Sequence, residues 1–231
     1  MRKISRISVV IPALNEEESI GLVIRDIPRY LVREIVVVDN GSHDETAQVA
    51  ANRGAKVVAE PERGYGSACL RGVSVLDHDT EIVVFIDADY SDYPQDIHVL
   101  VNPLLIDKAD LVIGSRLLGK REKGALLPQA VIGNKLAVFL IRLIYGFRYT
   151  DLGPFRAIRY DALMGLGMSD RNFGWTVEMQ IRAIKKGLRI TEVPVRYRKR
   201  IGTSKITGTL SGTIKAGVKI IFTIIKYSFI R

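Results

Sequence analysis

The sequence predicts an α/β protein with a mostly parallel central sheet and helices on both of its faces. Short runs rich in β-branched residues recur through the first half of the chain, and helix-compatible stretches separate them. Each run ends in a polar or glycine-containing turn, which is the pattern of a doubly wound, Rossmann-like sheet. Because such sheets bind ligands outside the carboxyl ends of their strands, we expect the functional site there.

The elements alternate regularly up to residue 114. Five buried strands are expected, at Ile7–Ile11, Glu34–Asp39, Lys56–Ala59, Glu81–Asp87 and Ala109–Gly114. Four helices are expected at Glu16–Arg29, Asp44–Arg53, Gly66–Leu76 and Gln95–Leu105. We find no internal repeat and no long linker, so the sequence predicts one domain over residues 1–206.

After residue 114 the alternation stops. Leu117–Leu127 is rich in Gly, Lys and Arg and is expected to form a mobile loop, while Pro128–Tyr145 is expected to form a long apolar helix. The remaining expected elements are a polar segment, a helix, a strand and a basic loop, at Thr150–Arg159, Trp175–Lys186, Arg189–Val195 and Arg196–Lys205.

The segment 207–231 is expected to be an amphipathic helix. Lys215, Lys219 and Lys226 fall on one helical face, and apolar residues fill much of the rest: Ile214, Val218, Ile221, Phe222, Ile225 and Phe229. This pattern is typical of a helix that lies in a membrane interface. The alternative is a helix packed on its own domain. No run of 18 apolar residues is free of charge, so we expect no ordinary membrane-spanning helix.

Charge is divided unevenly along the chain. Residues 1–115 carry 11 Lys and Arg against 19 Asp and Glu, whereas residues 116–231 carry 23 against 6. This excess predicts an anionic partner for the second half. Nucleic acid is disfavoured, because the basic residues are not interleaved with stacking aromatics. A single cysteine, Cys69, excludes an intramolecular disulfide, and without a visible export signal we expect a cytoplasmic protein.

Two carboxylates follow the apolar run 82–86. Asp87 and Asp89 flank Ala88, so both emerge at the carboxyl end of a central strand. Mg²⁺ and Mn²⁺ prefer oxygen ligands, and Mg²⁺ is usually held by one or two carboxylates together with substrate phosphates. Acids also cap strand ends, so the pair needs support from its surroundings.

Polar turns after the first two strands provide that support. Asn15 and Glu16 follow the first strand, and a turn from Asp39 to Asp44 follows the second. Both turns are expected at the edge of the sheet that carries Asp87. Glu16 could instead only mark a helix entry, and Asp44 could be a simple N-cap.

A glycine-rich turn at Arg63–Ala68 precedes the third helix. Gly64 and Gly66 would let backbone N–H groups approach a ribose or a phosphate closely. By itself, such a turn is weak evidence.

Taken together, these motifs resemble the family 2 glycosyltransferases of the GT-A fold, and within them the dolichol-phosphate mannose synthase and polyprenyl-phosphate glucosyltransferase group. The resemblance runs from Ile7 to about Lys205. It rests on Pro12-x-x-Asn-Glu16, Asp39-x-x-Ser-x-Asp44, Arg63-Gly-x-Gly-x-Ala68, Asp87-Ala-Asp89, Gly114-Ser-Arg116, Asp151-x-Gly-x-x-Arg156 and Arg200-x-Gly-x-Ser-Lys205.

The resemblance implies a role for each matching residue. The nucleotide would be bound by Pro12, Asn15, Glu16, Asp39, Ser42, Arg63, Gly64, Gly66, Asp87 and Ala88. Mg²⁺ or Mn²⁺ would be held by Asp87 and Asp89, and catalysis would involve Asp89, Arg116 and Glu178. The acceptor and phosphates would be contacted by Arg156, Arg200, Ser204 and Lys205.

Two of these assignments have alternatives. Ser91 stands where relatives often have a metal-binding Gln, and Asp92 could substitute for that residue through water. Glu178 opens a helix, where a glutamate is ordinarily a partner of the helix dipole.

The expected reaction is an inverting transfer of a hexose from a UDP- or GDP-sugar, such as UDP-glucose or GDP-mannose, to a polyprenyl or dolichyl phosphate at the cytoplasmic face of a membrane. A phosphate acceptor is favoured because Arg196–Lys205 supplies positive charge and no base is evident beside it. Within that run, Arg200 and Lys205 alone could matter, with the rest solvated. The alternative acceptor is a hydroxyl group of a soluble sugar, a glycerol-type compound or a glycolipid. A nucleotidyltransferase would need a basic glycine-rich loop where Pro12–Glu16 stands.

Overall fold

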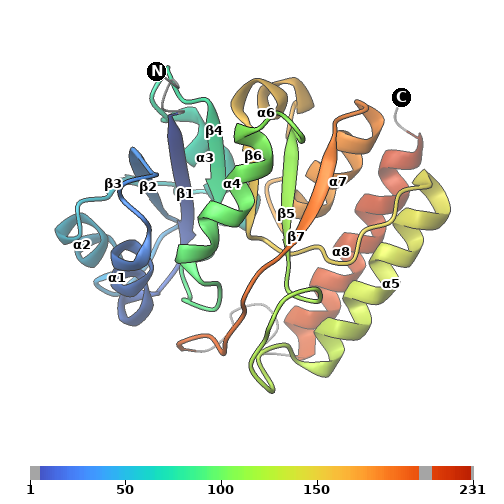
Figure 1. Ribbon diagram of the computed structural model, residues 1–231. Coiled ribbons are helices and arrows are strands. Elements are labelled where there is room, and N and C mark those ends of the chain that lie inside the picture. The colour runs from blue at the N-terminus through green and yellow to red at the C-terminus, as the bar shows by residue number, and fades with distance from the viewer. Residues whose placement is uncertain (1–5, 203–209, 230–231) are drawn as a thin grey trace.

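A seven-stranded sheet runs through the middle of the protein (Figure 1). Its strands are β1 (Ile7–Ala13), β2 (Glu34–Asp39), β3 (Lys56–Ala59), β4 (Ile82–Phe85), β5 (Leu111–Ser115), β6 (Arg156–Arg159) and β7 (Ile190–Pro194). They lie in the order β3-β2-β1-β4-β6-β5-β7, and all neighbours are parallel except β6, which is antiparallel to both β4 and β5. The computed structural model describes residues 6–202 and 210–229, and the side chains of the last helix from residue 216.

Helices cover both faces of this sheet, as the sequence predicts. One face carries α1 (Glu17–Asp26), α2 (Thr46–Asn52) and α4 (Ile97–Leu105), which follows a 3₁₀ turn, η1 (Pro94–Asp96). The other face carries α3 (Tyr65–Ser74), α5 (Pro128–Tyr145), α6 (Tyr160–Leu166), α7 (Trp175–Lys185) and α8 (Leu210–Phe229).

Alternating residues of each central strand serve the two cores. In β1, Val9 and Ile11 pack with α1 and α4, whereas Val10 packs on the opposite side with α3. Since both faces are covered, β1, β2 and β4 each contain a run of at least four successive apolar residues, at 9–13, 35–38 and 82–85. That continuity is what makes the first strands readable in the sequence.

The strand β6 departs from the prediction. The polar segment expected at Thr150–Arg159 contains this strand, and Ala157 pairs with Val84 on one side and Val112 on the other. A four-residue strand that begins and ends with arginine shows no apolar period, so its place in the sheet depends on the two neighbouring strands. The short helix α6 was also not predicted.

The helices α5 and α8 lie side by side at the edge of the molecule, and both begin near the same end (Figure 1). The Tyr145 hydroxyl donates a hydrogen bond of 2.6 Å to the Ile224 carbonyl. On α8, Ile224 and Tyr227 are buried, whereas Phe222 is 58% exposed. The helix therefore packs on its own domain with one face and leaves an apolar stripe on the other.

Some predictions about the C-terminal segment lie outside the described residues. These are the boundary at 206/207, the Ser204 and Lys205 positions and the Lys215 side chain. Of the helices in the described part of the chain, none has the length and apolar character needed to cross a membrane.

Candidate active site

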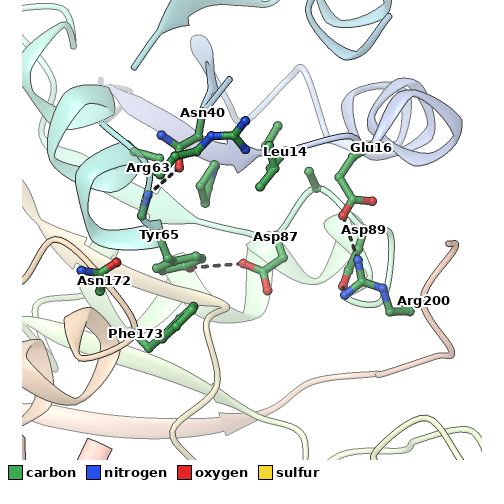
Figure 2. Close-up of a pocket in the computed structure, with 15 residues that line it drawn as sticks. Leu14, Glu16, Asn40, Arg63, Tyr65, Asp87, Asp89, Asn172, Phe173 and Arg200 are labelled. Carbon is green, nitrogen blue, oxygen red and sulfur yellow. Dashed lines mark hydrogen bonds and ion pairs between the residues drawn. The ribbon is translucent and has the colours of Figure 1, made fainter. Parts of the chain in front are cut away.

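The carboxyl ends of β1, β2 and β4 meet at a cavity of about 330 Å³ (Figure 2). Eight of the seventeen predicted site residues line it, namely Pro12, Glu16, Arg63, Gly64, Asp87, Ala88, Asp89 and Arg200. Their convergence follows from the parallel strands, which carry their following turns to one edge of the sheet.

Two adjacent carboxylates dominate one side of this cavity. The Tyr65 hydroxyl donates to Asp87 Oδ1 over 3.2 Å. Burial, reinforced by repulsion from Asp89, raises the pKa of Asp87 to about 7. Asp89 accepts hydrogen bonds from the backbone N–H and the hydroxyl of Ser91, at 2.9 and 2.6 Å. Ser91 therefore orients Asp89.

Arg200 supplies the positive charge beside these carboxylates. Its guanidinium lies 2.8 Å from Glu16 Oε1 and 3.1 Å from Asp89 Oδ2. The Ser19 hydroxyl donates to the other Glu16 oxygen over 3.0 Å. The Glu16 side chain thus faces Arg200, and it makes no capping hydrogen bond to α1.

Asp87 and Asp89 fit a hard divalent cation. Burial and, after it, repulsion between the two carboxylates raise the pKa of Asp87, and a bound cation would offset both effects. No third His, Cys, Asp or Glu joins them as a metal ligand among the residues that the structure describes. Asp92 is buried, and both of its carboxylate oxygens lack a hydrogen-bond partner in the described part of the chain. Asp87 and Asp89 would therefore supply only part of the ligand shell of the metal, and donor phosphates or water would complete it.

A second cavity, of about 270 Å³, adjoins the first. Tyr65, Asp87 and Phe173 line both cavities, and the second cavity is also lined by the start of α5 and by residues 216–220 of α8. Its polar lining includes Arg116, Gln129, Asn134 and Thr176.

Arg116 is held in a fixed orientation within this second cavity. Its Nε and Nη2 donate to the two oxygens of Asp151, at 2.8 and 2.7 Å. Burial opposes the charge of Arg116, but the Asp151 carboxylate outweighs burial and raises its pKa. The Tyr197 ring lies 5.3 Å below the guanidinium. Arg116 is therefore a permanent cation.

Asp151 in turn depends on β7 and α7. Glu192 accepts hydrogen bonds from the backbone N–H groups of Thr150 and Asp151, and Gln180 donates to the Asp151 carbonyl over 3.2 Å. The sequence motif contains Asp151, but its role as the clamp of Arg116 appears only in three dimensions.

Three predicted nucleotide-binding residues, Asn15, Asp39 and Ser42, do not line the cavity but form hydrogen bonds within the turns beside it. The Ser42 Oγ accepts a hydrogen bond from the Asn15 N–H at 2.9 Å, and the Ser42 N–H donates to Asp39 Oδ1 at 2.9 Å. Asp44 accepts from the Thr46 N–H at 3.1 Å and from the Glu17 N–H at 3.2 Å, so it joins the turn after β2 to the start of α1, while the N-cap position of α2 is Glu45. These bonds fix the turns after β1 and β2.

The glycines of the Arg63–Ala68 turn are needed for a different reason from the one expected. A Cβ atom on Gly64 would collide with the Arg171 carbonyl oxygen, and one on Gly66 with that of Asp170. Gly64 also has a φ of 149°. Contact with the 170–171 backbone therefore requires both glycines, although Gly64 still lines the cavity.

Arg156 and Glu178 lie away from the position predicted for them. Arg156 is fully buried and donates to the carbonyl oxygens of Thr176, Leu152 and Gly153. Glu178 accepts from the N–H groups of Ser169 and Asp170 and pairs with Arg182. Neither lines either cavity. These side chains hold the protein core together around α7, and we correct the expectation that they contact substrate.

The arginines of the basic run Arg196–Arg200 have different surroundings in the structure. Arg196 pairs with Asp96, and Arg198 stacks on Tyr90 and Tyr93. Arg200 alone of the run reaches the cavity. Its neighbours fasten the run to the loop that follows Asp89.

Sequence reasoning did not assign seven lining residues of the first cavity: Ala13, Leu14, Asn40, Tyr65, Ala68, Asn172 and Phe173. Asn40 accepts from the Gly64 N–H at 2.8 Å and donates to the carbonyls of Glu60 and Glu62. Asn40 follows Asp39 and Tyr65 lies between Gly64 and Gly66, so both occupy unspecified positions within the recognised motifs. Asn172 and Phe173 come from the loop before α7, which has no such signal.

Comparison with known proteins agrees with this geometry. Residues 8–166 match the model of the family described as Glycosyl transferase family 2. An uncharacterized glycosyltransferase of Mycobacterium tuberculosis is 42% identical over 213 residues, covering 91% of this chain and 94% of that protein. A dolichyl-phosphate hexose transferase of Haloferax volcanii is 34% identical over 203 residues, covering 87% and 86%.

A similar solved structure is glucosyl-3-phosphoglycerate synthase of Mycobacterium tuberculosis in complex with Mn²⁺, UDP and phosphoglyceric acid. It superposes with a TM-score of 0.79 at 26% identity and covers 98% of this chain and 80% of that one. The fold predicted from the motifs is thereby confirmed as GT-A. This chain belongs to family 2 of the glycosyltransferases and is an enzyme of that class.

Proposed function

We propose that this enzyme transfers a hexose from a UDP- or GDP-sugar to a polyprenyl phosphate at a membrane surface, with inversion at the sugar carbon and with Mg²⁺ or Mn²⁺ as cofactor. The observation that carries the proposal is the junction of the two cavities at Asp87, with carboxylates on one side and the fixed cation Arg116 on the other. A donor and an anionic acceptor can meet at that junction.

The first cavity suits the nucleotide half of the donor. Pro12 and Leu14 offer apolar contact, while Asn40, Arg63 and Glu16 offer polar groups along the same wall. The glucosyl-3-phosphoglycerate synthase that shares this fold binds UDP and Mn²⁺. Its likeness supports a nucleotide in the equivalent place here.

Asp87 and Asp89 would hold the metal, which when bound neutralises charge on the leaving nucleoside diphosphate. Arg200 already contacts Asp89, so it stands where it could also meet a diphosphate oxygen. The residue Ser91 keeps Asp89 oriented through two hydrogen bonds. Tyr65 does the same for Asp87.

The second cavity suits a phosphate acceptor. Arg116 provides a cation in a fixed orientation, and Gln129 and Asn134 provide amide groups. A phosphate monoester is already anionic at neutral pH, so it needs cations for positioning and no general base. The Haloferax volcanii relative, named for dolichyl phosphate, supports this acceptor class.

The membrane part of the proposal rests on a surface formed by α5 and α8. On each helix, four of the exposed large apolar residues have the same spacing: Ile132, Leu136, Phe139 and Leu143 on α5, and Val218, Phe222, Ile225 and Phe229 on α8. We call these eight residues the α5–α8 face. Exposed Lys135, Arg142 and Lys226 lie on the same two helices. Apolar residues with flanking cations are typical of helices that bind anionic lipid surfaces.

A hydroxyl acceptor is the second candidate. The structural neighbour binds phosphoglyceric acid, and its name describes a glucosyl group placed on that compound. Arg116 could bind the phosphate of such an acceptor as well. The two candidates therefore differ in which oxygen of the acceptor forms the new glycosidic bond.

A transfer assay tests the proposal. The purified protein is incubated with UDP- or GDP-sugars, Mg²⁺ or Mn²⁺, and either a short polyprenyl phosphate or 3-phosphoglycerate. We expect a glycosyl phosphate lipid with one of the donors, and loss of the product by about a hundredfold or more in Asp89→Asn. The matched control is Asp161→Asn, which neutralises an exposed carboxylate on α6. Transfer to 3-phosphoglycerate alone would favour the second candidate, and full activity in Asp89→Asn would defeat the donor assignment.

A further inference from the structure

The six-residue loop Ser169–Gly174 contacts α8 on one side and lines the first cavity on the other. It lies between α6 and α7, and its residues Asn172 and Phe173 line the first cavity. Figure 2 shows both side chains on the side of the cavity opposite Glu16 and Arg200. The position of this loop therefore sets the shape of the cavity.

On its inner side the loop touches the glycine-rich turn directly. The Ser67 N–H donates to the Arg171 carbonyl over 2.9 Å. Gly64 and Gly66 leave no room for a Cβ atom against the carbonyls of Arg171 and Asp170. Because backbone meets backbone here, a shift of the loop must also move the Gly64–Ser67 turn or break this contact.

On its outer side the loop is tied to α8. Lys219 Nζ lies 2.9 Å from Asp170 Oδ2, and the other oxygen of Asp170 accepts from the N–H groups of Asn172 and Gly174. The Asp170 side chain is 9% exposed, so this ion pair is shielded from solvent on one side. A single carboxylate thus links Lys219 to the fold of the loop.

A second connection reinforces the first. The Tyr227 hydroxyl of α8 donates to Glu178, which also accepts from the N–H groups of Ser169 and Asp170. Thr223 of α8 is buried beside Gly174, where a Cβ atom would press on its hydroxyl. The inner face of α8 therefore contacts the loop at three successive turns of the helix.

We propose that Lys219 and Asp170 are positioning residues for nucleotide binding: through this ion pair, α8 holds the Ser169–Gly174 loop against the Gly64–Ser67 turn and so forms the nucleotide cavity. The inference rests on the proposed function, since it presupposes that the first cavity binds a nucleotide. It adds that the helix carrying half of the α5–α8 face is also part of the donor site. By reciprocity, nucleotide binding in turn stabilises the docked position of α8.

The test is a nucleotide titration of the full chain in the absence of lipid. Trp175, the single tryptophan of the sequence, directly follows the loop and packs on Phe85, so its fluorescence reports on the loop itself. The probes are Mn²⁺ with UDP and, separately, Mn²⁺ with GDP. The variants are Lys219→Gln, the conservative Lys219→Arg, and the control Lys108→Gln, which removes an exposed lysine from the turn between α4 and β5.

We expect Lys219→Gln to weaken binding of the preferred nucleotide about five- to tenfold, while Lys219→Arg and Lys108→Gln stay within about twofold of wild type. In the transfer assay, Lys219→Gln should raise the KM for the nucleotide sugar and leave kcat and the acceptor KM within about twofold. A purely structural role would instead lower the thermal midpoint without this selective change in KM.

Two results would overturn the inference, and they are distinguishable. If wild type binds a nucleotide and Lys219→Gln binds it equally well, the coupling is wrong and the proposed function stands. If wild type binds neither UDP nor GDP with Mn²⁺, the donor assignment itself fails and the coupling fails with it.

Discussion

At the scale of single residues, Asp92 holds a buried carboxyl group whose oxygens have no hydrogen-bond partner among the described residues. Burial, with repulsion from Asp87, raises the pKa of Asp92 well above its ordinary value of 3.8. Folding therefore favours the protonated form of this group. As pH rises above about 4, unfolding releases a proton and the free energy of unfolding falls.

Asp92→Asn removes that titration with little change of shape. We expect the variant to unfold at a temperature close to that of wild type near pH 4, and at a progressively higher temperature than wild type as the pH rises toward 8. Thermal denaturation followed by circular dichroism measures the difference, with Asp161→Asn as the exposed control. A difference that does not grow with pH would contradict the prediction.

The second prediction at this scale concerns Arg116. Lysine keeps the charge but cannot donate from two nitrogens to both oxygens of Asp151, as Arg116 does. We expect Arg116→Lys to raise the KM for the phosphate acceptor about tenfold and to leave the KM for the nucleotide sugar within about twofold. Equal effects on both substrates would show that Arg116 does not belong to the acceptor half alone.

At the scale of elements, the start of α3 depends on its closeness to the Ser169–Gly174 loop. An added methyl group in Gly66→Ala would collide with the Asp170 carbonyl, so we expect a loss of about 2 kcal/mol or more in the free energy of unfolding. Gly165→Ala is the control, because a Cβ atom there meets nothing within 4 Å and alanine favours the helix. Urea denaturation measures both. Equal free energies of unfolding for the two variants would mean that the Ser169–Gly174 loop moves aside at little energetic cost.

At the scale of the whole molecule, the α5–α8 face predicts binding to lipid vesicles. Phe139 and Phe222 are each 58% exposed on neighbouring helices. We expect Phe139→Glu combined with Phe222→Glu to reduce flotation with phosphatidylglycerol vesicles about tenfold or more, because each change buries a charge in place of an apolar ring. Tyr30→Glu changes a residue that is 85% exposed outside this face, and it should float like wild type.

Flotation is measured without nucleotide, and the nucleotide affinity of both variants is measured separately in solution. Unchanged flotation of the double variant would remove the membrane part of the proposed function. It would leave the donor site untouched, since neither phenylalanine lines a cavity.

The sequence alone determined the strands that carry the site. β1, β2 and β4 are buried on both faces, so each contains a run of at least four apolar residues, and a polar turn follows that run. Parallel strands joined by helices bring those ends to one edge, which is why Glu16, Asp87 and Asp89 could be placed together. The amphipathic pattern also located α8, although the buried half of that helix was not separable from the exposed half.

The tertiary structure decided what lies opposite those strands. Four-residue β6 pairs only because β4 and β5 leave a place between them, and this pairing buries Arg156 within the core. Glu178, which the family resemblance assigned to catalysis, instead binds the Ser169–Gly174 loop. Phe173 and Asp89 line the same cavity, although more than 80 residues separate them in the chain. Local sequence patterns reflect burial and turns, whereas such contacts depend on how finished elements pack, and that packing is what completes the site.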